Sequence, residues 1–385
     1  MIRKFLGKNS TADDGSKAPL AGIKVVELAR ILAGPWAGQV LADLGAEVIK
    51  VESPEGDDTR TWGPPFIDRE DGGKDAAYFH AANRGKDSVT ADFTDADDLA
   101  RVKALIAEAD VVIENFKVGG LAKFGLDYES LKTDNPRLVY CSITGFGQDG
   151  PYAPRAGYDF IIQGMSGIMD LTGEPDGAPQ KIGVAYADIM TGLYAVIGIQ
   201  AALRQREATG RGQLVDMALF DVMVGTLANQ ATNYLSSGRN PKRMGNAHPN
   251  IAPYEAFEAK GGWLIVAVGN DNQFARFAEA IDLSAREEWR TNARRVKNRE
   301  SLSASVARRV AEWERDALLS KLEEARIPAG PINTVKQALT DPQIESRGMV
   351  VDLEEGLKGL RTPIRFSDAE LALGKASPSL PRDED

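Results

Sequence analysis

Short β-rich runs alternate with helical patterns in the first part of the chain, and this alternation restricts the possible folds most. The β-rich runs lie at 22–28, 47–51, 88–93, 110–114 and 137–143, and helical patterns lie between them, as at 35–45 and 95–108. A chain that returns to form a parallel strand needs a crossover connection, which is usually a helix. The pattern therefore predicts an α/β fold with an open, largely parallel sheet covered by helices on both faces.

A second region begins with a long apolar helical pattern from 185 to about 206. A short strand at 214–217 and a helix at 219–235 follow. The first helix is apolar on nearly every side, which predicts burial inside a large body or an interface. Beyond a Gly-, Asn-, Arg- and Pro-rich stretch, paired strands and three helices predict a smaller α+β domain; they are expected at 253–257, 262–268, 272–281, 301–314 and 315–326.

The chain of 385 residues is too long for one ordinary hydrophobic core, so more than one domain is expected. We predict a disordered lead-in, the first part of a large domain, a small domain with linkers, and a return to the large domain. The corresponding ranges are 1–18, 19–225, 226–330 and 331–385.

Charge and cysteine content restrict the partners and the compartment. The net charge of −10 repels phosphate backbones and anionic membranes, so neither nucleic acid nor a membrane is an expected partner. No apolar run reaches the ~18 residues that a membrane span needs. Cys141 is the single cysteine, so no intrachain disulfide forms, which fits a reducing cytoplasm. We expect a cytoplasmic protein.

Several familiar motifs are incomplete. Residues 145–150 match G-x-G-x-x-G after a predicted strand, but Pro151 and Pro154 interrupt the helix that should follow, which favours a Gly-rich turn over a dinucleotide site. His80 and His248 are the only histidines, and no cysteine accompanies either, so no metal site is predicted. A serine triad has no G-x-S-x-G elbow to support it.

Asp188 stands at the start of the long apolar helix. Unpaired backbone N–H groups and the positive end of the helix dipole favour the ionised form of a carboxylate there. Such a carboxylate can attack an activated acyl group as a nucleophile. The alternative is an ordinary helix N-cap, which the residue pattern alone favours.

The order of several short segments resembles the family III CoA-transferases, from about Leu20 to about Ser367. The matching segments include Asp188 with Thr191-Gly192 and the ranges 32–35, 44–52, 83–86, 110–116, 142–147, 157–159 and 209–213. The closest resemblance is to the succinyl-CoA:glutarate branch, through 56–66, 245–254 and 330–333.

This resemblance implies a Rossmann-like large domain built from both ends of the chain, a smaller inserted domain, and a homodimer of interlocked rings. It also implies transfer of CoA from an acyl-CoA, such as succinyl-CoA or another dicarboxyl-CoA, to a carboxylic acid such as glutarate. The reaction would pass through an aspartyl-CoA thioester on Asp188. CoA is then a substrate, and no tightly bound cofactor is expected.

The resemblance also implies roles for individual residues. Asp188 would be the nucleophile. The CoA nucleotide would contact Ile31, Leu32, Asn115, Phe116 and Lys123, with Arg84 and Lys86 near its phosphates or near the acceptor's distal carboxylate. Arg60 is an alternative anchor for a substrate carboxylate, and Tyr158 and His248 would contact substrate.

Two alternative functions remain. A 2-methylacyl-CoA racemase shares the fold, but those enzymes carry histidine where this chain has Tyr158, and removing an α-proton needs that base. A non-catalytic acyl-CoA-binding protein would bind without turnover. His248 itself is either a structural hydrogen-bonding residue of its loop or a base.

Overall fold

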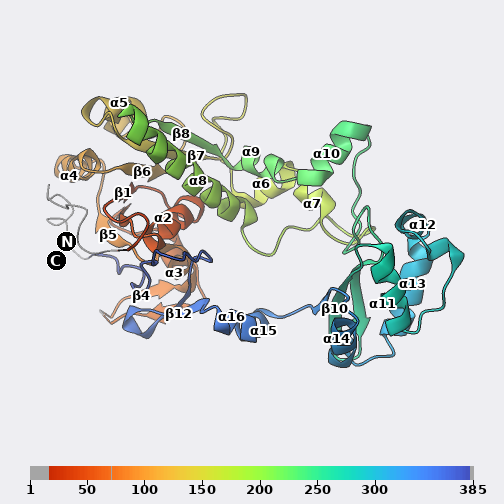
Figure 1. Cartoon of the computed structure of the whole chain (residues 1–385). Coiled ribbons are helices and arrows are strands. Elements are labelled where there is room, and N and C mark those ends of the chain that lie inside the picture. The colour runs from red at the N-terminus through yellow and green to blue at the C-terminus, as the bar shows by residue number, and fades with distance from the viewer. Residues whose placement is uncertain (1–16, 71, 382–385) are drawn as a thin grey trace. The chain divides into compact units, whose positions relative to one another are not determined.

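The structure, a computed structural model, describes residues 17–70 and 72–381 and divides into two compact units (Figure 1). The first unit contains the described residues up to Ile168, Ile182–Thr232 and the chain from Pro342 onward; the second contains Met169–Lys181 and Asn233–Asp341. The sequence placed the boundaries at 226 and 331 and did not anticipate the excursion at 169–181. Residues 1–16 of the predicted lead-in lie outside the described residues.

Six parallel strands form the sheet of the first unit, in the spatial order β5-β2-β1-β6-β7-β8. In chain order this is 3-2-1-4-5-6, the arrangement of doubly wound dinucleotide-binding folds. The chain fills the sheet outward in opposite directions from the neighbouring strands β1 and β6, so the strand order reverses between these two strands. The strands are β1 Lys24–Glu27, β2 Glu47–Glu52, β5 Asp87–Thr90, β6 Val111–Glu114, β7 Val139–Thr144 and β8 Leu214–Ala218.

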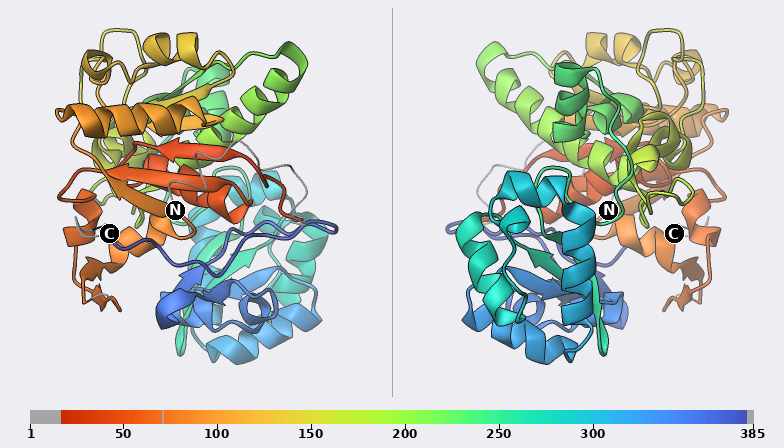
Figure 2. Two further views of the ribbon diagram at one scale, coloured as in Figure 1. Left: turned by 90° about the vertical axis from the view of Figure 1, so that its left-hand side faces the viewer. Right: turned by 90° about the vertical axis from the view of Figure 1, so that its right-hand side faces the viewer.

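Helices cover this sheet in two layers because successive strand side chains point to opposite faces. Val25 belongs to a core shared with α2 (Ala33–Asp43) and α8 (Tyr186–Thr209), and its neighbour Val26 belongs to a core shared with α4 (Ala96–Ala107) and α5 (Tyr128–Asp134). Figure 2 gives two further views of the chain. The predicted α/β class with a large parallel sheet is confirmed.

The predicted helix over 219–235 is wrong in one respect: two helices, α9 and α10, occupy this range. The chain turns between them, and Ala228 adopts a positive φ of 46°. The remaining elements of the first unit are short, and two of them, α7 and α10, continue into the second unit. They are β3 Phe66–Asp68, β4 Lys74–Ala76, α3 Ala77–Asn83, α6 Asp159–Met165, α7 Ile168–Leu171, α9 Leu219–Gly225, α10 Ala228–Ser237, α16 Pro342–Ser346, β12 Val350–Asp352 and β13 Lys358–Leu360.

The second unit is an antiparallel sheet with helices, in the order β11-β10-β9. Its core includes Trp289 and Phe277, which are almost completely buried. The elements are β9 Tyr254–Ala259, β10 Gly262–Ala267, α11 Asp271–Ala280, α12 Asn292–Lys297, α13 Arg299–Val310, α14 Arg315–Glu324, β11 Ala329–Pro331 and α15 Val335–Leu339.

Among the described residues, α8 is the one helix whose length and composition match a membrane span. Part of this helix is packed against the sheet through residues such as Ala195 and Ile199. A buried core helix can have the same length and composition, so these features alone do not indicate a membrane span.

Candidate active site

A cavity of about 400 Å³ opens beside the carboxyl ends of β1, β6 and β7. It lies at the point where the strand order reverses, between β1 and β6, which is where open α/β sheets bind ligands. The loops after β1 and β6 line it at 30–33 and 115–118, and the segment 153–159 lines it further along. Asp188 lines the same cavity from the first turn of α8.

The Asp188 carboxylate has no hydrogen-bond or ion-pair partner among the residues that the structure describes. Burial, and then the neighbouring charge of Asp159, raise its pKa to about 7. The sequence argument had favoured the ionised form because of the helix terminus. In the folded protein burial and a second carboxylate outweigh that effect.

Asp159, not Asp188, caps the start of α8. Its Oδ1 accepts the backbone N–H of Ala187 at 2.7 Å, and the N–H of Asp188 lies at 3.4 Å from the same oxygen. Its other oxygen accepts a hydrogen bond from Gln163 Nε2 at 2.8 Å. The N-cap interpretation of Asp188 is therefore wrong, and its carboxylate is left for chemistry. The sequence had included Asp159 in a matching segment but had given it no role.

Ile31 and Leu32 line the cavity, as expected from the resemblance. Ile31 has a φ of 71°, which is rare and unfavourable for a β-branched residue. Its N–H donates to Asp57 Oδ2 at 3.2 Å, which helps to hold this conformation. Backbone strain of this kind concentrates at functional sites.

Asn115 and Phe116 also line the cavity and join its two sides. Asn115 accepts a hydrogen bond from the Arg30 N–H at 3.0 Å and donates to the Arg30 carbonyl at 2.7 Å. The loops after β1 and β6 are thereby fixed to each other. Tyr158, which is largely exposed, completes the set of predicted residues found here.

Two close backbone contacts at this site require glycine. A Cβ on Gly145 would lie 2.4 Å from the Cα of Gly157, so both residues must lack side chains where their loops cross at the cavity. This crossing accounts for the first glycine of the motif at 145–150. A Cβ on Gly192 would lie 2.7 Å from the Ala33 carbonyl oxygen, so Gly192 allows α8 to approach the start of α2.

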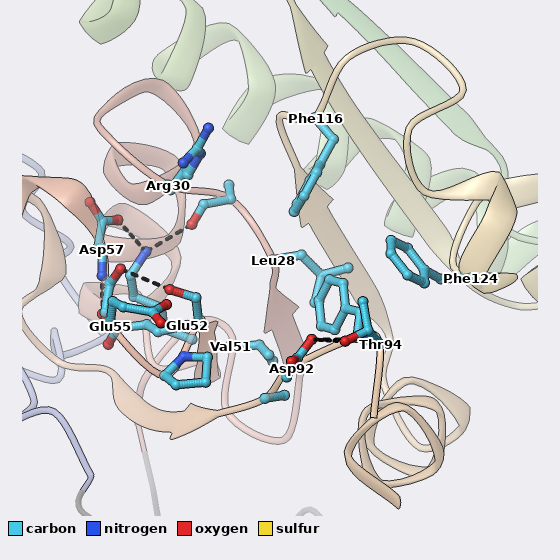
Figure 3. A pocket seen from close by; sticks show the side chains of 17 residues that line it. Leu28, Arg30, Val51, Glu52, Glu55, Asp57, Asp92, Thr94, Phe116 and Phe124 are labelled. Carbon is cyan, nitrogen blue, oxygen red and sulfur yellow. Dashed lines mark hydrogen bonds and ion pairs between the residues drawn. The ribbon is translucent and has the colours of Figure 1, made fainter. Parts of the chain in front are cut away.

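A second cavity of about 430 Å³ lies at the carboxyl ends of β1, β2 and β5 (Figure 3). Phe116 and Phe124 stand on one side of it, and carboxylates such as Glu55 and Asp57 stand on the other. Arg30 and Phe116 line both cavities. One elongated ligand can therefore contact the two in succession.

Three predicted cation sites have a different environment from the one expected. Arg60, Arg84 and Lys86 are buried and do not line the Asp188 cavity. Arg60 binds Glu52 at 2.7 Å and Asp75 at 2.9 Å, and Arg84 binds Asp43.

Lys86 is held by Glu27 at 2.8 Å and by the Pro35 carbonyl at 2.8 Å, and burial lowers its pKa to about 8. A buried cation already paired with a carboxylate is not free to bind a phosphate. The cations along the Asp188 cavity are instead Arg30, Lys117 and Arg155, which the sequence did not single out.

Two further predicted residues lie elsewhere. Lys123 is exposed on the segment that carries Phe124, with its ammonium 4.6 Å from that ring. His248 belongs to the second unit, where its Nδ1 accepts the Asn250 N–H at 3.1 Å and its ring contacts Tyr254. Among residues 17–70 and 72–381, no group of three or more potential ligands is arranged to hold a metal ion.

Comparison with known proteins assigns the family. A model described as CoA-transferase family III matches residues 20–384. The chain belongs to CoA-transferase family III. The protein named succinate–glutarate CoA-transferase from Agrobacterium fabrum is 55% identical over 373 residues, which cover 94% of this chain and 93% of that protein.

Two other relatives agree with this assignment. Succinyl-CoA:glutarate CoA-transferase from Homo sapiens is 40% identical and covers 96% of this chain and 85% of its own length. The crystal structure of a CAIB/BAIF family protein from Brucella suis has a TM-score of 0.89 and 64% identity, covering 95% of this chain and 97% of that one. The family resemblance predicted from the short segments is confirmed.

Proposed function

We propose that this CoA-transferase moves CoA from succinyl-CoA or another dicarboxyl-CoA to a dicarboxylic acid such as glutarate, with Asp188 as the nucleophile. The substrates are suggested by the names of the relatives from Agrobacterium fabrum and Homo sapiens. The observation that carries the role of Asp188 is that it lines the cavity where the strand order reverses, while Asp159 caps the helix in its place.

The proposed reaction begins when an oxygen of Asp188 attacks the thioester carbonyl. The C–S bond breaks, which gives an acyl-aspartyl anhydride and the CoA thiolate. The thiolate then attacks the aspartyl carbonyl and releases the donor acid, which leaves an aspartyl-CoA thioester. The acceptor carboxylate attacks this thioester, and the released thiolate takes the new acyl group, which regenerates Asp188. One thioester replaces another, so protons and charge balance.

We place CoA across the two cavities. The aromatic side of the second cavity, formed by Phe93, Phe116 and Phe124, suits a flat nucleobase. The acidic side disfavours phosphates, so these belong near exposed cations such as Lys117 and Lys123. Leu32 and Ile31 then contact the part of the ligand that leads towards Asp188.

For the acceptor's distal carboxylate, Arg155 is a better candidate than the buried Arg60 or Arg84. Arg155 lines the Asp188 cavity, is exposed, and stacks on Tyr152 at 4.0 Å. A guanidinium binds a carboxylate in bidentate geometry. Tyr158 would contact substrate beside it, whereas a substrate role for His248 remains a prediction.

We also propose a homodimer. The outer side of α8 exposes Tyr194 and Ile197, the latter 61% accessible, and α6 exposes Phe160 at 59%. Large apolar side chains exposed on neighbouring helices are expected where a second subunit covers them. The interlocked-ring arrangement and the cytoplasmic location remain predictions.

The test is mass-spectrometric detection of new acyl-CoA species after the protein is mixed with succinyl-CoA and a panel of mono- and dicarboxylic acids. Asp188→Asn runs alongside as an isosteric variant that lacks the nucleophile. We expect glutaryl-CoA from the wild type and at least ~10³-fold less from the variant, because a covalent step is lost.

Three results would contradict the proposal. Equal turnover by Asp188→Asn would remove the aspartyl mechanism. Binding of succinyl-CoA without transfer to any acid would favour a non-catalytic binder, and deuterium uptake at the acyl α-carbon would favour the racemase. No histidine lines the Asp188 cavity, so the racemase has no second base there.

A further inference from the structure

We propose that Asp159 is a positioning residue for Asp188. Asp159 caps α8 in place of Asp188, and its negative charge repels the Asp188 carboxylate until Asp188 becomes acylated. This inference rests on the proposed role of Asp188 as nucleophile.

The first observation is the way in which α8 begins. The N-cap position, Ala185, offers no side-chain acceptor. The first backbone N–H groups of a helix have no partner within the helix, and the side chain of the N-cap residue often supplies one. Here Asp159 Oδ1 accepts the Ala187 N–H at 2.7 Å from a different helix, α6. Asp188 can therefore react without uncapping the helix that carries it.

The second observation is that Asp159 is itself held in place. Gln163, one turn further along α6, is fully buried and donates from Nε2 to Asp159 Oδ2 at 2.8 Å. The Gln163 Oε1 accepts the Ile182 N–H at 2.9 Å, in the segment that leads into α8. One amide thus fixes the Asp159 carboxylate relative to the start of α8.

The third observation is electrostatic. Two carboxylates meet at the start of α8, where burial, followed by the charge of Asp159, raises the pKa of Asp188. Ionised Asp188 is repelled by Asp159, whereas an anhydride or a thioester of Asp188 is neutral. Conversion to the covalent intermediate therefore relieves repulsion, and a more basic carboxylate is also a better nucleophile.

Other charged groups face Asp188 as well. Tyr78 on α3 is near enough for Asp188 to contribute to raising the pKa of its phenol, after burial. The cations on the walls of the same cavity are Arg30, Lys117 and Arg155. Arg30 is ion-paired with Asp58 at 2.9 Å. None of these cations is hydrogen-bonded to Asp188 or Asp159 among the described residues, whereas Asp159 accepts the Asp188 N–H and its charge acts on the Asp188 carboxylate.

The decisive variant is Asp159→Asn, because its amide oxygen can still accept the Ala187 N–H while the negative charge is lost. Asp159→Ala loses both. The matched control is Asp221→Asn, which removes an exposed carboxylate from the first turn of another short helix, α9.

The experiment measures kcat/KM for succinyl-CoA between pH 5 and pH 9, with a saturating acceptor. The wild type should lose activity below about pH 7, because only ionised Asp188 attacks. For Asp159→Asn we expect the acid limb to move roughly one pH unit lower, with activity above pH 8 reduced several-fold. Asp221→Asn should follow the wild type.

A second readout is the fraction of protein that carries CoA on the Asp188 peptide, measured by mass spectrometry after mixing with succinyl-CoA at pH 8. One pKa unit corresponds to a factor of ten, so the ratio of adduct to free protein should fall roughly tenfold in Asp159→Asn. Asp159→Ala should show the same pH shift together with a lower melting temperature.

The outcomes separate this inference from the proposed function. An adduct on Asp188 with an unmoved acid limb in Asp159→Asn would overturn the role of Asp159 and leave the nucleophile intact. A loss of melting temperature alone would assign Asp159 a purely structural role and would also overturn it. The absence of any adduct, with full activity in Asp188→Asn, would instead overturn the proposed function.

Discussion

At the scale of single residues, the sequence interpretation needed most correction, because burial changed which partners the charged side chains meet. Arg60, Arg84 and Lys86 have the residue types expected of an anion site, but each is buried against a carboxylate. The reverse holds for Asp188: its residue type is common at helix starts, but its carboxylate lies in a cavity and has no partner in the part of the chain that the structure describes. Residue type and spacing give no information on which partner a charge meets in the folded chain.

Glu114 gives a test of buried charge at this scale. It ends β6, its carboxylate accepts the Phe116 N–H at 2.7 Å, and burial raises its pKa to about 7. Because the folded state holds this proton more tightly than the unfolded state, the stability from Glu114 is complete at low pH. It is lost as pH rises through 7.

We therefore compare the unfolding free energy of Glu114→Gln with that of the wild type at pH 5.5 and at pH 8. The difference should shift by about 2 kcal/mol in favour of the variant as pH rises from 5.5 to 8. Glutamine keeps an acceptor for Phe116 and never ionises. Urea denaturation at the two pH values measures the change, with the exposed Glu129→Gln as control. A difference between variant and wild type that is independent of pH would contradict the assignment.

At the scale of helices and strands, the packing of α8 on α2 assembles the site, because α8 carries Asp188. Gly192 lies one turn beyond Asp188, at the point where α8 meets the Ala33 carbonyl and Trp36. Contact between these helices sets the distance between Asp188 and the loop that contains Leu32. The Thr191-Gly192 pair was a matching segment of the family, and this contact supplies its physical reason.

Gly192→Ala should lower the unfolding free energy by about 1–3 kcal/mol, since a Cβ there overpacks the contact with backbone and indole. It should also lower kcat, because the start of α8 is displaced. Gly225→Ala is the matched control, since nothing lies within 4 Å of a Cβ at this position near the end of α9. Thermal unfolding and transfer assays on both variants measure the effects; an equal response would show that helix propensity, not the contact, matters.

At the scale of the whole molecule, two features matter: the return of the chain to its first unit, and the association of two copies of the chain in the proposed homodimer. The segment after Leu371 closes that unit: the Ala376 carbonyl accepts the Gly85 N–H at 3.2 Å, and the Pro378 carbonyl accepts a hydrogen bond from Arg69 at 2.8 Å. These contacts hold the sequence-distant ends of the unit together. The side of α8 that carries Tyr194 and Ile197 is exposed within this unit, and in the proposed homodimer a second copy of the chain would cover it.

Ile197→Glu should convert the proposed dimer to monomer, because a carboxylate buried in an apolar contact lacks a partner. Analytical ultracentrifugation at micromolar concentration measures the mass, and Lys103→Glu on α4 is the control for a charge change at an exposed position. A wild type that is monomeric, or an Ile197→Glu variant that remains a dimer, would contradict the placement of the interface.

The sequence by itself determined the α/β class, the alternation of β1, α2 and β2, the family, and the position of Asp188 at the start of a long apolar helix. These follow from local periodicity and from the order of short motifs along the chain, and both can be recognised without knowledge of the fold. Only the tertiary structure decided that Asp159 caps α8, that Arg60 and Lys86 are buried in ion pairs, and that two helices occupy 219–237. Each of these depends on contacts between residues distant in sequence or on a single backbone angle. Local sequence patterns predict neither such contacts nor such an angle.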